Sequence, residues 1–314
     1  YINLNSKRWN INDKERSYKL NPGYMGKLKS TEFENDIFVN SYGFRDISNY
    51  PSFLENPLND NIFIIGDSFI FGVGVDYKNT IPANVEYDLN GFNVFNLGTP
   101  SYALDDYYVT LNQFLKYDPT FVVVSIFAGK LFGGADDIYA TKKIKNQKML
   151  QEKKEIEIKL KNDPSLIKNK IKSLKKILSR HSALYNFTLL HFGTYMRSKK
   201  SSLIDLNDEI IKKREIGYQI YSNFLDELKK ISEKKDFRTI ILHIPPESDI
   251  TNNYTETRDR ILEITKSKNL DCIDGFSILK KHKNIYYPID GHLNSSGNKI
   301  ISKEISEMII KYSE

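Results

Sequence analysis

Five short runs of apolar residues divide this chain, and each is rich in β-branched or aromatic side chains. Runs of this length that do not alternate with polar residues are typical of strands buried on both faces. They lie at residues 61–65, 92–97, 121–127, 238–244 and 270–273. We therefore predict five strands that form one sheet buried on both faces.

Between these runs, apolar residues recur every three or four positions, which predicts amphipathic helices. Thr80 can cap the first helix, with Pro82 in its first turn, and Gly91 is suited to end it. Later helices are expected after Leu104, along 216–231, around 258–266 and through 301–309. Strands that alternate with helices indicate a mainly parallel five-stranded sheet in a three-layer α/β/α fold of the flavodoxin-like kind.

The chain divides into three kinds of sequence. Residues 1–60 show little periodicity and many turn formers, so we expect an extension that packs on the core. Residues 61–140 and 201–314 carry the α/β pattern. Residues 141–200 begin with a stretch dense in Lys, Glu and Ile, which is typical of long solvated helices. We interpret 141–200 as a helical insertion, a lid or an arm.

Charge and composition narrow the function classes. The 314 residues carry a formal charge of +6, mostly from lysines in the helical middle, where a solvated face is the simplest explanation. No stretch clusters Arg and Lys with aromatics, so we expect no nucleic-acid partner, although a mildly basic surface suits acidic glycans. Cys272 is the only cysteine, which excludes an intrachain disulfide and a thiolate metal cluster.

No apolar run approaches the roughly twenty residues that a membrane-spanning helix needs. The sequence starts at Tyr1 rather than Met, so a preceding signal or anchor stays open. We expect an extracytoplasmic protein, periplasmic, secreted or anchored through a missing N-terminus, and leave a cytoplasmic location open.

Candidate catalytic residues follow the ends of predicted strands. Ser68 follows the first strand, within Gly66-Asp-Ser68, and His292 precedes the last helix with Asp290 two residues before it. Because parallel strands end at one rim of the sheet, these groups can meet there. A serine hydroxyl needs a base to accept its proton, an imidazole can be that base, and a carboxylate orients the imidazole. The alternative is that Asp67 and Ser68 only form a turn or a cap.

An oxyanion would also need donors at this rim. Gly98 ends the second strand and can bring its backbone N–H close to a substrate, because no side chain obstructs the approach. The N–H of Ser68 itself is the second candidate donor.

Three sequence blocks resemble those of SGNH/GDSL hydrolases: Gly66-Asp-Ser68, Asn96-Leu-Gly98 and Asp290-Gly-His292-Leu-Asn-Ser-Ser-Gly297. Asn40-Ser-Tyr-Gly-Phe-Arg45 and Ile244-Pro-Pro246 are similar to a bacterial branch, in which some members are O-acetyl esterases or O-acetyltransferases of surface polysaccharides. The resemblance covers roughly residues 40–135 and 210–312. It implies Ser68 as nucleophile, His292 as base, Asp290 as its orienting carboxylate, and the N–H groups of Ser68 and Gly98 as oxyanion donors.

One block departs from this family pattern. The family has an Asn, a further oxyanion donor, just after the Gly that ends the third strand, but here Gly129 is followed by Lys130. Losing one such donor typically costs about 10²–10³ in turnover, although a lysine ammonium can also donate. An active esterase or acyltransferase and a catalytically impaired glycan-binding protein are therefore both open, and a lipase is a weaker third reading because 141–200 is highly charged.

The remaining candidates have plainer interpretations. Arg45 can meet an acidic group of a substrate, but a structural salt bridge is the more ordinary role. His243 lies inside a predicted strand and is expected to be a hydrogen-bonded core histidine. No His, Asp and Glu residues show metal-ligand spacing, so we predict no metal and no cofactor.

The expected partners are an acylated glycan or small ester, with a membrane-bound acyl-transfer partner as an option and the oligomeric state left open.

Overall fold

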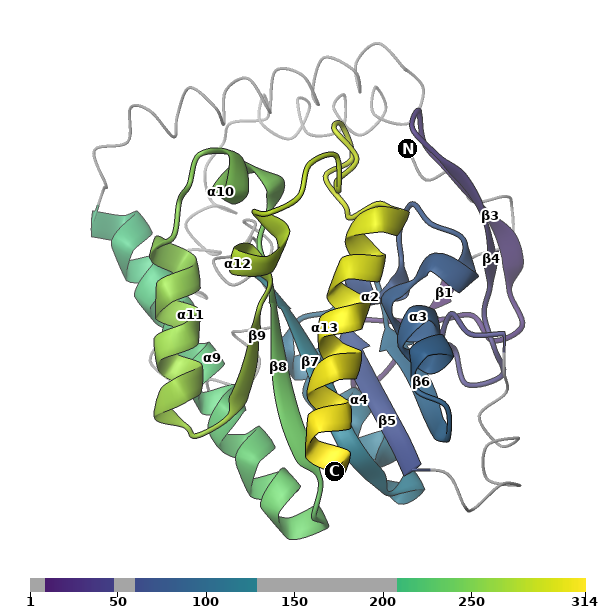
Figure 1. The fold of residues 1–314 in the computed structure, drawn as a ribbon. Coiled ribbons are helices and arrows are strands. Elements are labelled where there is room, and N and C mark those ends of the chain that lie inside the picture. The colour runs from purple at the N-terminus through teal and green to yellow at the C-terminus, as the bar shows by residue number, and fades with distance from the viewer. Residues whose placement is uncertain (1–8, 48–59, 129–207) are drawn as a thin grey trace, which may run out of the picture. The chain divides into compact units, whose positions relative to one another are not determined.

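The computed structural model describes residues 9–47, 60–128 and 208–314, with side chains given from 214 onward in the last range (Figure 1). Contacts divide the chain into two compact units, Tyr1–Ala140 with Arg214–Glu314, and Thr141–Lys213. The predicted helical insertion at 141–200 lies outside the described residues.

A five-stranded sheet forms the centre of the first unit, in the order β6-β5-β7-β8-β9. Every neighbouring pair in this sheet is parallel, which confirms the predicted fold class. The strands are β5 (Asp60–Gly66), β6 (Phe92–Gly98), β7 (Pro119–Phe127), β8 (Arg238–Ile244) and β9 (Asp271–Asp274). The first of these five strands along the sequence, β5, thus lies inside the sheet, with β6 on one side and β7 on the other.

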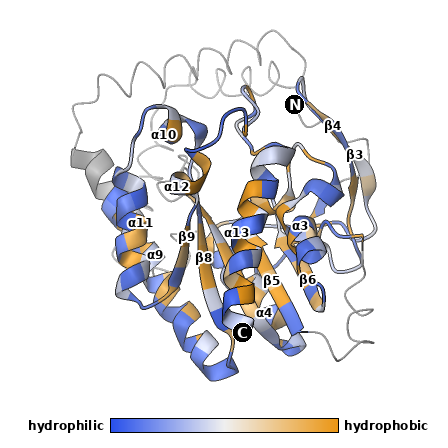
Figure 2. Ribbon diagram, viewed as in Figure 1, coloured by the Kyte–Doolittle hydropathy of each residue, from blue (hydrophilic) through white to orange (hydrophobic). Residues whose placement is uncertain are grey.

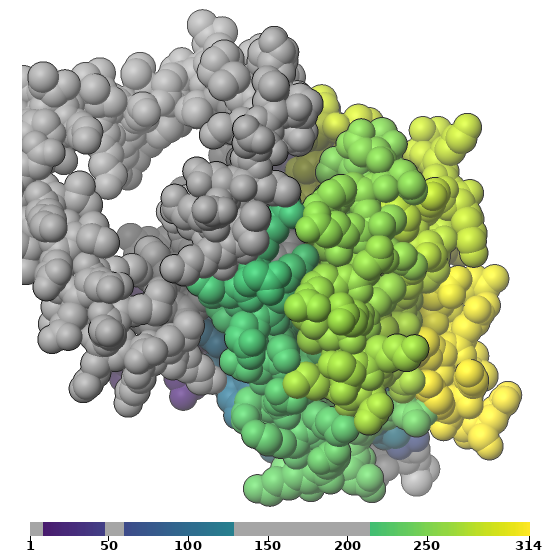
Figure 3. Space-filling model, turned by 90° about the vertical axis from the view of Figure 1, so that its left-hand side faces the viewer, coloured from purple at the N-terminus to yellow at the C-terminus, as the bar shows by residue number. Residues whose placement is uncertain are grey.

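Helices cover both faces of the sheet. One face is covered by α4 (Leu104–Phe114), α9 (Asp208–Lys235) and α11 (Glu256–Ser267). The other is covered by α2 (Ser68–Phe71), α3 (Ile81–Asp88), α12 (Gly275–Leu279) and α13 (Ser295–Ser313). Figure 1 and Figure 3 both show α9 and α11 side by side, with α13 on another side of the molecule.

Alternate residues of β5 serve the two faces, as the pleat of a strand requires. Ile62 and Ile64 belong to the core beneath α3 and α13, whereas Phe63 and Ile65 belong to the core beneath α4, α9 and α11. All four side chains are almost completely buried. Residues 62–65 are continuously apolar because both faces are covered, and Figure 2 shows the sheet as predominantly hydrophobic.

Local signals mark the starts of two helices: α3 begins where it was predicted, whereas α13 begins at Ser295, ahead of the predicted stretch 301–309. The Thr80 side chain accepts a hydrogen bond from the Ala83 N–H, and Pro82 lies in the first turn of α3. Asn294 caps α13 by accepting from the N–H groups of Ser296 and Gly297. The short helices η1 (Tyr77–Asn79) and η2 (Leu115–Tyr117) lie in the connections.

The N-terminal segment contains structure that periodicity did not reveal. Two antiparallel hairpins pair β1 (Asn10–Ile11) with β2 (Lys19–Leu20), and β3 (Met25–Lys29) with β4 (Glu34–Phe38). Leu28 and Ile37 of the second hairpin pack in one cluster with Phe71 and Val73 of the core. The strands escaped prediction because each is short and buries at most two side chains.

None of the helices in the described ranges combines the length and the apolar composition that crossing a bilayer would require.

The packing of α13 makes a direct prediction about stability. Ile305 is fully buried under this helix, whereas Ile310 on the same helix is 44% exposed. Ile305→Ala should lower the free energy of unfolding by about 2–5 kcal/mol, because it leaves a cavity in the core. Ile310→Ala should change it by about 0.5 kcal/mol or less. Urea unfolding of the two variants measures this, and equal losses would contradict the described orientation of α13.

Candidate active site

Ser68 lies at the junction between strand β5 and helix α2. β5 ends at Gly66, and α2 begins with Ser68 as its first residue. The buried carboxylate of Asp67 caps the helix by accepting from the Phe69 N–H at 3.0 Å. Asp67 therefore has the capping role, and the partly exposed Ser68 is held in place beside it.

His292 lies on a tight loop that precedes α13. The Tyr287 N–H donates to the His292 carbonyl at 2.8 Å, and the Gly291 N–H donates back to the Tyr287 carbonyl at 2.8 Å. Gly291 has φ of +82°, a left-handed conformation that glycine adopts readily. The Tyr286 hydroxyl donates to the Pro245 carbonyl at 2.8 Å, which ties the loop to the segment after β8.

The structure brings Ser68, His292 and Asp290 together. His292 Nε2 lies 2.8 Å from Ser68 Oγ, although the two residues are 224 positions apart. On the other side of the ring, His292 Nδ1 is hydrogen-bonded to Asp290 Oδ1. The side chains of His292 and Asp290 are 22% and 25% exposed, so the site is accessible to a ligand. This arrangement can move a proton from the hydroxyl to the ring while the carboxylate fixes the tautomer.

Gly98 ends β6 at this rim. Its N–H donates to the side-chain oxygen of Asn96 at 3.1 Å. A Cβ on Gly98 would lie 2.3 Å from the Phe71 nitrogen, which explains the glycine by close packing of β6 against α2. Donation by the Gly98 N–H to an oxyanion stays a prediction.

The other predicted oxyanion residues, Gly129 and Lys130, lie outside the described residues. Ser101, an exposed residue in the connection between β6 and α4, has a φ of +64°, which costs a non-glycine residue about 1–2 kcal/mol. Other non-glycine residues away from the site also have positive φ, so this conformation alone does not assign Ser101 to the site.

Arg45 neither contacts a substrate nor forms a salt bridge among the described residues, which were the two roles considered for it. The side chain is 1% exposed, so it cannot meet a substrate, and its guanidinium donates to four backbone carbonyls. The acceptors are the carbonyls of Asp36, Phe71, Gly72 and Val75, at 2.5–3.2 Å. Burial lowers the pKa of Arg45 to about 10, which leaves it charged at neutral pH. Arg45 therefore ties β4 to the loop that follows α2.

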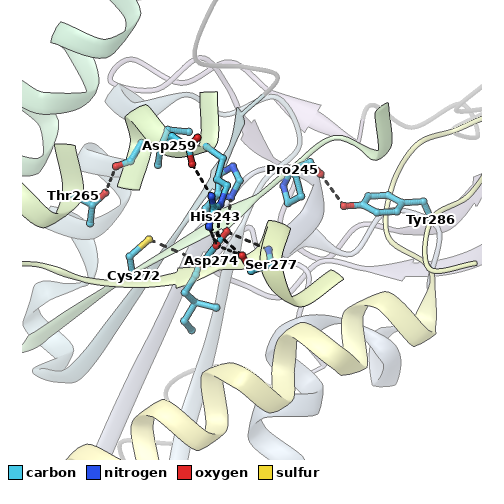
Figure 4. Close-up of polar contacts among 11 residues, drawn as sticks. His243, Pro245, Asp259, Thr265, Cys272, Asp274, Ser277 and Tyr286 are labelled. Carbon is cyan, nitrogen blue, oxygen red and sulfur yellow. Dashed lines mark hydrogen bonds and ion pairs between the residues drawn. The ribbon is translucent and has the colours of Figure 1, made fainter. Parts of the chain in front are cut away.

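A second serine, histidine and aspartate meet near the ends of β8 and β9, as Figure 4 shows, and they differ from the first set. Ser277 Oγ donates to Asp274 Oδ2 at 2.5 Å, and Arg258 donates to the same oxygen. His243 Nδ1 lies 3.8 Å from Asp274 Oδ1, beyond hydrogen-bond distance. The carboxylate thus contacts the serine directly, and the histidine is not placed to act as its base.

The environment of Asp274 indicates a structural role. Burial would raise the pKa of this carboxyl, but its contacts with His243, Arg258 and Ser277 hold it well below its usual range. His243 is buried as predicted, yet neither ring nitrogen has a hydrogen-bond partner among the described residues. The predicted place of His243 in the core is right, and its hydrogen bonding stays a prediction.

Within the described ranges, no three His, Cys, Asp or Glu side chains form a group that could hold a metal ion. The expected absence of a metal or a cofactor remains a prediction.

Several solved structures are similar in fold. A protein of the G-D-S-L family from Desulfitobacterium hafniense matches 79% of this chain and 99% of its own, with 15% identity and a TM-score of 0.45. A member of the lipolytic protein G-D-S-L family from Veillonella parvula matches 79% and 96%, with 11% identity and a TM-score of 0.45. AlinE4, an SGNH-hydrolase family esterase, matches 81% and 96%, with 12% identity and a TM-score of 0.38.

No family model matches the sequence, and no curated protein matches it either. The function is therefore inferred from the side chains of the site.

The contacts of Arg45 predict a large effect on stability. Arg45→Met should lower the free energy of unfolding by about 3–5 kcal/mol, because it leaves buried carbonyl groups without a hydrogen-bond donor. Arg260→Met is the matched control, since Arg260 is 41% exposed and pairs with Glu263 on the surface. That change should cost about 1 kcal/mol or less. Urea unfolding compares the two, and a loss below about 1 kcal/mol for Arg45→Met would show that the carbonyls do not depend on it.

Proposed function

We propose that this protein is a serine esterase or acyltransferase that works through a covalent ester on Ser68. The observation that supports this most strongly is the continuous contact from Ser68 Oγ through the His292 ring to Asp290. A hydroxyl within 2.8 Å of an imidazole nitrogen, with a carboxylate on the opposite nitrogen, is the arrangement that nucleophilic acyl transfer needs.

In the proposed first half-reaction, Ser68 Oγ attacks the carbonyl carbon of the ester and its proton passes to His292 Nε2. Asp290 accepts the hydrogen bond from Nδ1 and stabilises the imidazolium. His292 then gives the proton to the departing alcohol oxygen as the C–O bond breaks, and the acyl group remains on Ser68. In the second half-reaction, water or a sugar hydroxyl gives its proton to His292 and attacks the acyl carbon. The bond between that carbon and Ser68 Oγ then breaks, His292 returns the proton to Ser68 Oγ, and the free acid or the new ester leaves.

The oxyanion needs at least one backbone donor near Ser68. The N–H of Ser68 is the first of α2, and the first N–H groups of a helix have no acceptor within the helix. We assign this N–H to the oxyanion. A second donor is expected from the Gly98 N–H or from Lys130, as the sequence suggests.

We propose small O-acyl groups, acetyl in particular, on a bacterial glycan as the substrate. The support is the sequence resemblance at 40–45 and 244–246, together with the positive net charge. A glycan of the cell surface places the reaction outside the cytoplasm and allows a membrane-bound acyl-transfer partner. Hydrolysis and transfer share the same first half-reaction, so they differ only in the acceptor of the second.

The second candidate is a catalytically impaired glycan-binding protein. Lys130 favours it, because an Asn is expected at that position of an active member. The two functions differ in one measurable property, the reactivity of Ser68.

Reaction with a fluorophosphonate probe tests the proposal. We expect the intact protein to be labelled once, Ser68→Ala to be unlabelled, and His292→Ala to be labelled about 10²–10⁴ times more slowly. Ser277→Ala is the matched control, because Ser277 belongs to the cluster in which the histidine does not contact the serine. Its labelling should equal that of the intact protein. Folded protein that does not react would support the binding function instead.

A further inference from the structure

The tip of the β3–β4 hairpin lies against the loop that carries Asp290 and His292. The carboxylate of Glu32 accepts a hydrogen bond from the Asp290 N–H at 2.7 Å. It also accepts from the Ile289 N–H, at 3.1 Å to Oε1 and 3.2 Å to Oε2. These contacts join residues 257 and 258 positions apart, so they form only in the folded chain.

The loop has few other means of holding this backbone. Ile289 is 63% exposed, so burial does little to fix it. The bonds between Tyr287 and His292 or Gly291 lie within the loop itself. The Tyr287 hydroxyl anchors one end by donating to the Gly74 carbonyl at 2.6 Å. Glu32 instead holds the backbone of Asp290 directly, next to the carboxylate that contacts His292.

The hairpin is a firm support for this contact. The Ser30 N–H donates to the Phe33 carbonyl at 2.9 Å, and the Glu32 N–H donates to Ser30 Oγ at 3.0 Å, which fixes the turn. The Phe33 ring lies 5.1 Å from the Tyr287 ring. Arg45, by donating to the Asp36 carbonyl, ties β4 to the core.

The placement of Glu32 also has an electrostatic cost. Burial raises the pKa of Tyr287, and the negative charges of Asp290, Glu32 and Asp76 add to that shift. Several carboxylates therefore face the same small region, where like charges repel. Two charge-assisted hydrogen bonds to backbone N–H groups offset this repulsion.

We propose that Glu32 is a positioning residue that holds Asp290, and through it the His292 ring, in the geometry that the reaction needs. This inference rests on the proposed function, and it assigns the N-terminal hairpin a part in the site. A misplacement of about 1 Å can cost about 10²-fold in rate, so a contact that fixes the backbone of the orienting carboxylate has a measurable effect.

Steady-state kinetics on a small aryl acetate test the proposal with the full chain. Glu32→Ala should lower kcat about 10- to 100-fold and leave KM within about twofold, because the proposed role of Glu32 is to position Asp290 and not to bind substrate. Glu32→Gln keeps an acceptor oxygen at the same reach and should retain most of kcat. Glu32→Asp keeps the charge but is shorter, so its kcat should lie between those of the Gln and Ala variants. The expected order depends on reach rather than on charge.

Glu34→Ala is the matched control, because Glu34 lies on the same hairpin and pairs with Lys27 and Lys29 instead of the loop. Its kcat should equal that of the intact protein. The proposal is overturned if Glu32→Ala retains full kcat, if Glu32→Gln loses as much as Glu32→Ala, or if Glu34→Ala loses as much.

Hydrogen exchange separates this inference from the proposed function. In Glu32→Ala and Glu32→Asp, the amides of Ile289 and Asp290 should exchange about tenfold faster or more, whether or not the protein hydrolyses esters. An inactive intact protein whose exchange responds in this way would end the proposed function and leave Glu32 as the anchor of the loop. Unchanged exchange would refute the anchoring, whatever the activity.

Discussion

The hydrogen bond between Ser68 and His292 depends on most of the described structure. Ser68 is fixed by the end of β5, which lies inside the sheet because its neighbours β6 and β7 are both parallel to it. His292 is fixed by the start of α13, which is held by apolar burial on the face beneath it. The reactive contact is therefore a consequence of how both faces of the sheet are covered.

The N-terminal segment supplies polar constraints that the sheet does not. Arg45 is buried and charged, and it joins β4 to the loop that follows α2 through backbone carbonyls. Glu32, at the tip of the same hairpin, contacts the loop of Asp290 from the other direction. The N-terminal segment therefore contacts both elements of the catalytic pair. Arg45 binds the Phe71 carbonyl in the helix that begins with Ser68, and Glu32 binds the backbone of Asp290, whose carboxylate contacts His292.

The sequence predicted what depends on apolar periodicity and little of what depends on individual polar contacts. The strand at 61–65 was evident because both of its faces are buried, and Ser68 and His292 followed from parallel strands ending at one rim. β3 was missed because only one of its side chains is buried, which leaves no apolar periodicity to detect. The roles given to Arg45 were wrong because its guanidinium is buried and donates to four backbone carbonyls, which no spacing in the sequence indicates. The same reason hid the contact of Glu32.

Trapping the acyl-enzyme tests the central claim most directly. The protein is mixed with p-nitrophenyl acetate, quenched in acid during the first turnover, and analysed as peptides by mass spectrometry. The Ser68–His292 contact predicts one acetyl group, located on Ser68, that accumulates before free acetate reaches its steady rate. Ester turnover by folded protein with the acetyl group on another residue, or with no covalent acetyl group, would contradict the account.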